Sequence, residues 1–304
     1  MAWMSGAGHK KIFELHQKYG DIVRISPNQL SFSYPEAWND IMGHRKRGQD
    51  ENGKDPDFWR GDDNLTLVGS NRERHSRLRK IMSHGFSAQA MNEQQPVFQK
   101  YADLLVTQLR NSVTDGDAVD ITKWYNWATF DMAGDLIFGE PFGCLETEQY
   151  HPWVKLIFMH IKGISISTAL IRYPFAEAII KFMTPKSVAK DIQSHHEFTQ
   201  AQVKKRISYE NPRPDFMESM IKAHKNGDVS MREMLANAHN LIVGGSETTA
   251  TTLAYAEMRL ILAKMIWNFN MELDARSKGW LEKNVVYLLW EKPELFIRLT
   301  PRMA

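Results

Sequence analysis

Apolar residues recur with the period of an α-helix along most of the middle of the chain. The spacing is clearest in Val97–Leu109, Trp124–Ile137 and Phe158–Ile171, where apolar positions return every three or four residues. A stripe of this kind buries one face of a helix against a core. The middle of the chain is therefore predicted to be mainly α-helical.

Two short β hairpins are predicted to flank this helical region. Near the N-terminus, Asp21–Ile25 and Gln29–Ser33 are β-rich runs on either side of the turn sequence Ser26-Pro27-Asn28. Near the C-terminus, two further β-rich runs flank a polar turn, Glu291–Glu294. These runs are Val285–Trp290 and Leu295–Leu299. The predicted fold class is mainly α with small β hairpins.

No shift in composition marks a domain boundary. Gly48–Asp57 and Tyr209–Asp215 are interrupted by charged residues or proline and are predicted to be loops, and neither resembles a long linker. Residues 1–304 are therefore interpreted as a single domain.

The segment from Met231 to Phe269 is too long for an ordinary helix. After Gly245 no glycine or proline occurs until Gly279, and apolar residues continue throughout. One helix over this segment would be roughly 57 Å long at 1.5 Å per residue. Uncapped periodic runs of this length usually belong to coiled coils, membrane spans or repeats. The sequence matches none of these patterns.

Composition and charge narrow the function classes. Thirty-eight basic residues against 36 acidic residues leave a net charge of +2, so no global charge favours nucleic acid as a partner. The single cysteine, Cys144, cannot form an intramolecular disulfide, which favours a reducing, intracellular setting. Met1–Lys11 has no apolar run long enough for a signal peptide or a membrane span. No transmembrane anchor is expected.

Gly244–Thr249, with the sequence Gly-Gly-Ser-Glu-Thr-Thr, is the most informative string for chemistry. Each glycine costs a helix about 1 kcal/mol relative to alanine, so a pair suggests that something approaches the backbone closely. Glu247 and Thr248 provide a carboxylate and a hydroxyl that can pass protons. A kinked core helix with a threonine-rich surface is the alternative interpretation.

A second candidate is the basic cluster Arg74–Lys80, which holds His75 and Arg79. An arginine guanidinium matches a carboxylate through two parallel hydrogen bonds. A basic helix face exposed to solvent is the simpler interpretation of these residues alone.

Residues Ala238–Thr249 resemble the long helix that crosses the haem in cytochromes P450. That resemblance implies that Gly244 and Gly245 leave room for oxygen, and that Glu247 and Thr248 deliver protons. Lys18–Asn28 resembles the first hairpin of fungal members. Arg74–Lys80 followed by Phe86-Ser87 resembles their C helix, in which the positions of His75 and Arg79 contact the haem propionates.

The resemblance carries further expectations. It implies a fungal haem-thiolate monooxygenase of secondary metabolism that oxidises a small apolar organic substrate with electrons from an NADPH-dependent reductase. Its expected location is intracellular, in the cytoplasm or at the surface of the endoplasmic reticulum. Phe138–Gly143 also resembles the family, and chemically it is a helix that ends in a turn.

The loop that carries the haem-ligand cysteine is missing. Ala254–Leu260 resembles the helix that begins just after that cysteine, yet it follows the oxygen-binding helix directly, so an internal deletion junction is predicted near residues 252–254. Cys144 precedes the oxygen-binding helix in an unrelated context, and Glu210–Arg213 is interpreted as a chance match to the family's Glu-x-x-Arg motif. The fold is therefore expected to be a truncated cytochrome P450 with no metal ligand.

Loss of the thiolate implies that the chain does not support monooxygenation, because thiolate ligation favours O–O cleavage. His195 and His196 are expected to lie on the surface of a polar helix. Two alternatives remain open: a non-catalytic remnant that binds small molecules, and a gene-model or splicing product with no function of its own.

Overall fold

The computed structural model describes residues 3–43, 45, 48–50, 52–55, 58–59, 64–113, 117–170, 173, 175, 178, 180, 182, 185–211, 213–247 and 251–302. For 186, 243, 245–247 and 251–256 it describes the backbone alone. The chain folds into two compact units. The smaller unit comprises residues 1–60, 161–183 and 284–291, and the larger unit comprises the rest. The interpretation of residues 1–304 as a single domain stays a prediction.

The smaller unit contains the predicted N-terminal hairpin. Strands β1 (Ile22–Ser26) and β2 (Gln29–Phe32) pair antiparallel and form a sheet of two strands, so this prediction is confirmed. The other elements of the unit, besides the second half of α7, are α1 (Gly8–Tyr19), α2 (Glu36–Met42), β5 (Val285–Val286) and β6 (Trp290–Glu291). The Val286 N–H donates to the Gly6 carbonyl at 2.8 Å and joins β5 to the start of the chain.

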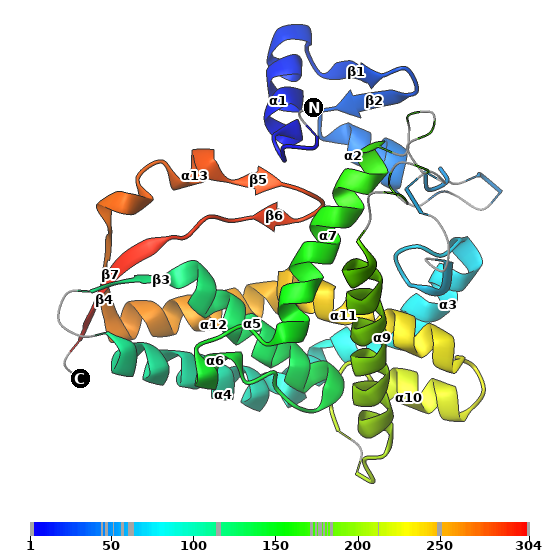
Figure 1. Cartoon of the computed structure of the whole chain (residues 1–304). Helices are drawn as coiled ribbons and strands as arrows, with labels where there is room; N and C mark the ends of the chain where they lie inside the picture. The colour runs from blue at the N-terminus through cyan, green and yellow to red at the C-terminus, as the bar shows by residue number, and fades with distance from the viewer. Residues whose placement is uncertain are drawn as a thin grey trace. The chain divides into compact units, whose positions relative to one another are not determined.

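The larger unit is mainly helical (Figure 1). Its elements are α3 (Arg72–Met82), η2 (Ser83–Phe86), α4 (Ala88–Ser112), α5 (Ile121–Phe138), α6 (Cys144–Thr147), the first half of α7 (Pro152–Leu170), α9 (Lys186–Ile207), α10 (Glu218–Lys225), α11 (Met231–Glu247), α12 (Thr251–Asn268), η3 (Ala275–Ser277), α13 (Trp280–Lys283) and three strands. The helices predicted from periodicity correspond to α4, α5 and α7, and Ile171, the last residue of the third run, lies outside the described residues. The mainly α fold class is confirmed.

Helix α5 forms the centre of the larger unit. The Asp120 carboxylate accepts a hydrogen bond from the Thr122 N–H at 3.2 Å and begins the helix, and Gly139, with a φ of 83°, ends it. A left-handed residue at this position favours glycine, because glycine has no Cβ. Most residues of α5 are buried, and the helix packs against α4, α6, α9 and α11. The predicted helix end at Phe138–Gly143 is confirmed.

The predicted C-terminal hairpin is wrong. Val285–Val286 pairs with Trp290–Glu291 across a tight turn in which Leu288 has a φ of 56°. The last run forms β7 (Phe296–Pro301), which lies between β3 (Ala118–Asp120) and β4 (Phe269–Leu273) in an antiparallel sheet.

Contacts at the start of β7 explain this pairing. The Leu295 N–H donates to the Asp120 carboxylate at 3.0 Å, and the Asp274 N–H donates to the Phe296 carbonyl at 3.1 Å. Both edges of β7 are thereby joined to strands that are distant in sequence, and local turn signals do not reveal such pairing.

The long segment 231–269 is described as two helices, α11 and α12, with residues 248–250 outside the description. Helix α11 packs against α5, α9 and α10, whereas α12 packs against α4 and continues into β4. The described residues include one helix, α7, that is long and apolar enough to cross a membrane by length and composition. Trp153, Val154 and Ile157 are buried in its first half.

Candidate functional site

Helix α3 carries the basic cluster and divides it between two faces. Asn71 caps the helix by accepting a hydrogen bond from the Arg74 N–H at 3.1 Å, and Leu78 is fully buried. His75 and Arg79 are four residues apart and share one face, where His75 is half-buried and Arg79 is exposed. Both positions expected to contact propionates therefore lie on one side of α3, and this role stays a prediction.

Arg74 and Arg77 lie on the other face of α3 and bind Glu233 in the first turn of α11. Burial opposes ionisation of Glu233, but hydrogen bonds from Ser230 and Arg77 outweigh it and lower the pKa of this carboxyl group. Glu233 is eleven residues before Gly244, roughly 16 Å along the helix axis. These two arginines therefore hold α3 to the start of α11 and are remote from the glycine pair.

The other predicted residues lie at the end of α11. Gly244 is half-buried, and the backbone of Gly245 and Glu247 is helical. Thr248 lies outside the described residues. For Glu247 the backbone alone is described. The roles of these residues in oxygen binding and proton delivery stay predictions.

Cys144 is fully buried at the start of α6. The Asp131 carboxylate accepts hydrogen bonds from the backbone N–H groups of Cys144 and Leu145 at 3.0 and 2.9 Å. Burial raises the pKa of the Cys144 thiol to about 12, although the His151 N–H donates to Sγ at 3.4 Å. Because the sulfur is fully enclosed by protein, Cys144 does not fit the role of an iron ligand.

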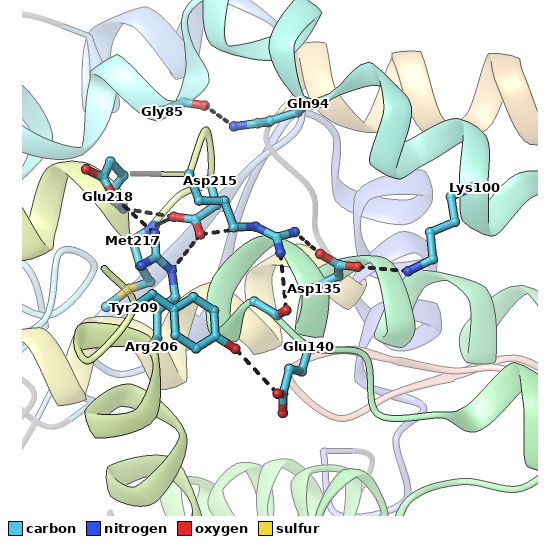
Figure 2. A network of polar contacts seen from close by, with 12 residues as sticks. Gly85, Gln94, Lys100, Asp135, Glu140, Arg206, Tyr209, Asp215, Met217 and Glu218 are labelled. Carbon is cyan, nitrogen blue, oxygen red and sulfur yellow. Dashed lines mark hydrogen bonds and ion pairs between the residues drawn. The ribbon is translucent and has the colours of Figure 1, made fainter. Parts of the chain in front are cut away.

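A network of buried ions joins α9, α10 and α5 (Figure 2). Arg206 of α9 contacts Asp215 at 2.7 Å and Glu218 at 3.0 Å, and the side chains of Arg206 and Asp215 are 2% and 0% exposed. Arg213 binds Asp135 of α5 and donates to the Gly139 carbonyl at 3.2 Å. This network holds the Tyr209–Asp215 loop, which has no regular secondary structure in its described residues.

This arrangement is consistent with the interpretation of Glu210–Arg213 as a chance match to the Glu-x-x-Arg motif. Arg213 pairs with Asp135 and Asp215, whereas Glu210 is exposed on the loop.

A histidine cluster lies where α7, α9 and α11 meet. His195 Nε2 and His239 Nδ1 are 2.8 Å apart, and the ring of His160 contacts that of His195 edge-on. Trp153 stacks on His195 at 4.5 Å between ring centroids. Burial lowers the pKa of His195 to about 3 and that of His239 to about 4. These imidazoles are therefore neutral at pH 7.

The expectation that both adjacent histidines lie on the surface is wrong for His195, which is 3% exposed. His195, Thr199, Val203 and Arg206 follow one another at helical spacing and are all buried. Three of these four residues are polar, so a search for apolar periodicity does not find the buried stripe of α9. Among the described residues, no group of three or more His, Cys, Asp or Glu side chains is arranged to hold a metal ion.

Known proteins are similar to this chain over most of its length. A family model described as Cytochrome P450 matches residues 2–256. A trichothecene C-15 hydroxylase from Fusarium sporotrichioides is 44% identical over 257 residues, which cover 83% of this chain and 52% of the relative. A cytochrome P450 monooxygenase from Aspergillus oryzae is 40% identical over 257 residues, 83% of this chain and 51% of the relative. The chain spans about half the length of these relatives.

A third comparison extends beyond α11. A cytochrome P450 monooxygenase from Neocamarosporium betae is 36% identical over 441 residues, which cover 98% of this chain and 85% of the relative. An alignment of 441 positions is roughly 140 positions longer than the 304 residues of this chain can fill.

Proposed function

We propose, since this chain belongs to the cytochrome P450 family, that it is a partial member that binds small organic molecules and does not oxygenate them. The single observation that carries this proposal is the state of the only cysteine. Cys144 is fully enclosed by protein at the start of α6, where its sulfur is out of reach of a haem. Haem bound by cysteine supplies oxygen activation when the sulfur is a thiolate, and this chain offers no such sulfur.

The junction near residues 252–254 is supported by the surface of α12. Met258, Leu262 and Ile266 follow one another at i, i+4 and i+8 and are 55%, 53% and 48% exposed. A helix normally buries such a stripe. We infer that the roughly 140 positions present in the Neocamarosporium relative include the residues that would cover it.

Glu257 supports the same inference. Its side chain is buried on α12, and burial alone raises the pKa of the carboxyl group to about 8. No described residue donates a hydrogen bond to it. A buried carboxyl group usually has a partner, so its partner is expected in the segment that this chain lacks.

The carbon monoxide difference spectrum of the purified, haem-supplemented chain tests the proposal. We expect no absorption band at the position characteristic of thiolate-bound haem, because no thiolate is available. Denatured protein would give the same negative result, so cooperative unfolding in urea must be demonstrated on the same sample. A thiolate band that disappears in Cys144→Ser would contradict the proposal.

Binding of small molecules is favoured by a cavity between α9 and α11 of about 370 Å³. Ligand pockets in proteins have volumes of about 300–1,000 Å³, so this space suits a small organic molecule. A complete relative would act on such a molecule with electrons from an NADPH-dependent reductase, inside the cell. Here the reductase has no reaction to serve.

Glu257→Gln is expected to stabilise the protein as the pH rises. The folded carboxyl group, with a pKa of about 8, keeps its proton at pH values where the carboxyl group of the unfolded chain, with its ordinary pKa of 4.5, has lost it. The unfolded state therefore binds fewer protons between these two pKa values, and stability falls as the pH rises. Glutamine removes this dependence. Its advantage in unfolding free energy should grow by about 2–3 kcal/mol between pH 5 and pH 7.

Urea unfolding at the two pH values measures this difference. Glu272→Gln makes the same substitution at an exposed position on β4 and is the matched control. An equal effect of the two substitutions would show that Glu257 is ionised in the folded state.

A further inference from the structure

Strand β4 lies at the edge of the sheet β3-β7-β4 in the larger unit. It pairs with β7 over all five of its residues, from Phe269 to Leu273. Lysine, proline and bulges commonly protect an edge strand from pairing with another chain, and β4 has none of them. Among the described residues, no strand pairs with its outer edge. This edge is therefore open to a further strand.

Hydrogen bonds at the two ends of β4 show which of its backbone groups face β7. The Arg302 N–H donates to the Asn268 carbonyl at 2.8 Å, and the Asp274 N–H donates to the Phe296 carbonyl at 3.1 Å. In an antiparallel ladder, every second residue of a strand bonds to the neighbouring strand. Since Asn268 and Asp274 are both even-numbered, the even positions between them bond to β7 and the odd positions face outward.

The outward backbone groups belong to Phe269, Met271 and Leu273. No described residue forms a hydrogen bond with the outward groups of Met271 or Leu273. The side chains of these three residues share one face of the sheet, on which Leu299 of β7 pairs with Met271 and is 2% exposed. Leu273 is 64% exposed at the end of this face. The open edge thus combines free backbone groups with an apolar face that is only partly covered.

One register allows the open edges of two copies of the chain to pair. With Met271 at a two-fold axis, the five residues of each β4 align antiparallel with the five of the other. Each Met271 N–H then donates to the Met271 carbonyl of the second copy, and each Leu273 N–H donates to the Phe269 carbonyl. Leu273 lies opposite Phe269 of the second copy, so the apolar face continues from one copy to the next.

The charges on the opposite face of β4 favour the same register. Glu272 lies opposite Asn270 of the second copy, and the Asn270 side chain accepts a hydrogen bond from Arg302 Nε at 2.9 Å. Glu272 and Arg302 are both exposed, and neither forms an ion pair within the part of the chain that the structure describes. The register brings them together in two symmetric ion pairs. An axis at Glu272 would instead place like charges opposite each other, which is unfavourable.

We propose that the chain forms a two-fold symmetric dimer through β4, so that the two sheets become one continuous sheet. A contact in which each copy uses the same surface closes on itself. Further growth through the other edge is disfavoured, because β3 has three residues, Ala118–Asp120, and leads directly into α5. The dimer does not depend on whether haem or a small molecule binds.

Sedimentation velocity over a range of about 1–100 μM measures the association. We expect the sedimentation coefficient to rise with concentration to that of a dimer and no further. Met271→Pro removes the outward N–H at the axis and leaves the bonds from the even positions to β7, so it should abolish the rise. Met271→Ala retains the N–H and should still dimerise. Cooperative unfolding in urea verifies that each variant is folded.

Three outcomes of this experiment overturn the proposal. A chain that stays monomeric throughout leaves the β4 edge to another occupant, such as an extended segment of a different protein. Growth beyond the dimer would show that the contact does not close. A dimer that is as stable in Met271→Pro as in the wild type would use a different surface.

An exchange of charges tests the register. Glu272→Lys faces Arg302 in both symmetric contacts and should weaken the dimer about 10-fold, whereas the double variant with Arg302→Glu should return to within about 3-fold of the wild type. Glu210→Lys, at an exposed loop position, is the control and should dimerise like the wild type. If the double variant is as weak as Glu272→Lys, the register is wrong. The urea comparison of Glu272→Gln belongs at concentrations where the chain is monomeric.

Discussion

Replacing Arg206 with methionine is expected to lower the free energy of unfolding by about 3–5 kcal/mol. Arg206 is the centre of the buried network, with Asp215 at 2.7 Å and Glu218 at 3.0 Å (Figure 2). Without the guanidinium group, the fully buried Asp215 carboxylate keeps only the more distant Arg213, at 3.5 Å, as a cationic partner. An uncompensated buried charge costs far more than the ion pair contributes.

The neighbouring residue provides a matched control. Lys205 carries the same charge on α9, but it is 54% exposed and pairs with Glu140 at the surface. Lys205→Met should therefore change the unfolding free energy by about 1 kcal/mol or less. The double variant Arg206→Met with Asp215→Asn should recover part of the loss, because asparagine retains an oxygen for the N–H groups of Met217 and Glu218 while the buried charge is removed. Equal effects of the two single substitutions in urea unfolding would contradict the prediction.

The sequence identified the elements whose signals are local. The periodic runs in α4, α5 and α7 specify helices because each run is longer than one turn and has a consistent face. The first hairpin was also recognised, because its turn sequence and both strands are contiguous. In these cases the residues that determine the element are near one another in the chain.

Elements that depend on distant partners were not recognised. Strand β7 follows a β-rich run and a turn in the sequence. It nevertheless pairs with β3 and β4, which lie far from it in sequence. The hydrogen bond from the Leu295 N–H to Asp120 joins residues separated by 175 positions. Because local hydrophobic patterns carry no information about such partners, the C-terminal hairpin was predicted incorrectly.

The residues of the candidate site show the same difference between local signals and distant partners. The resemblance placed His75 and Arg79 in one helix, and both residues lie in α3. It did not separate them from Arg74 and Arg77, because the partner Glu233 is more than 150 residues away. His195 was missed for a different reason: its buried stripe on α9 is polar, and hydrogen bonds rather than apolar contacts satisfy it.

Lowering the pH from 7 to 4 is expected to cost on the order of 5 kcal/mol of stability through His195 and His239 together. Burial lowers the pKa of these side chains to about 3 and about 4, from the ordinary histidine value of 6.5. Below pH 6.5 the unfolded state binds protons that the folded state does not, so stability falls as the pH decreases toward the folded pKa values. His160 and His196 add to this effect because their positive charges oppose protonation of both residues.

A comparison of variants measures how much of this pH-dependent loss of stability is due to His195. In His195→Phe, the loss of unfolding free energy between pH 6 and pH 4 should be about 2.5 kcal/mol smaller than in the wild type. Carboxylates also titrate in this range, and Asp191 acts on His160, so the exposed His84→Phe serves as the control and should follow the wild-type curve. If His195→Phe also follows that curve, His195 is already protonated in the folded protein at pH 6. It would then donate from both ring nitrogens, and the buried Nδ1–H, which has no acceptor, would make that state costly.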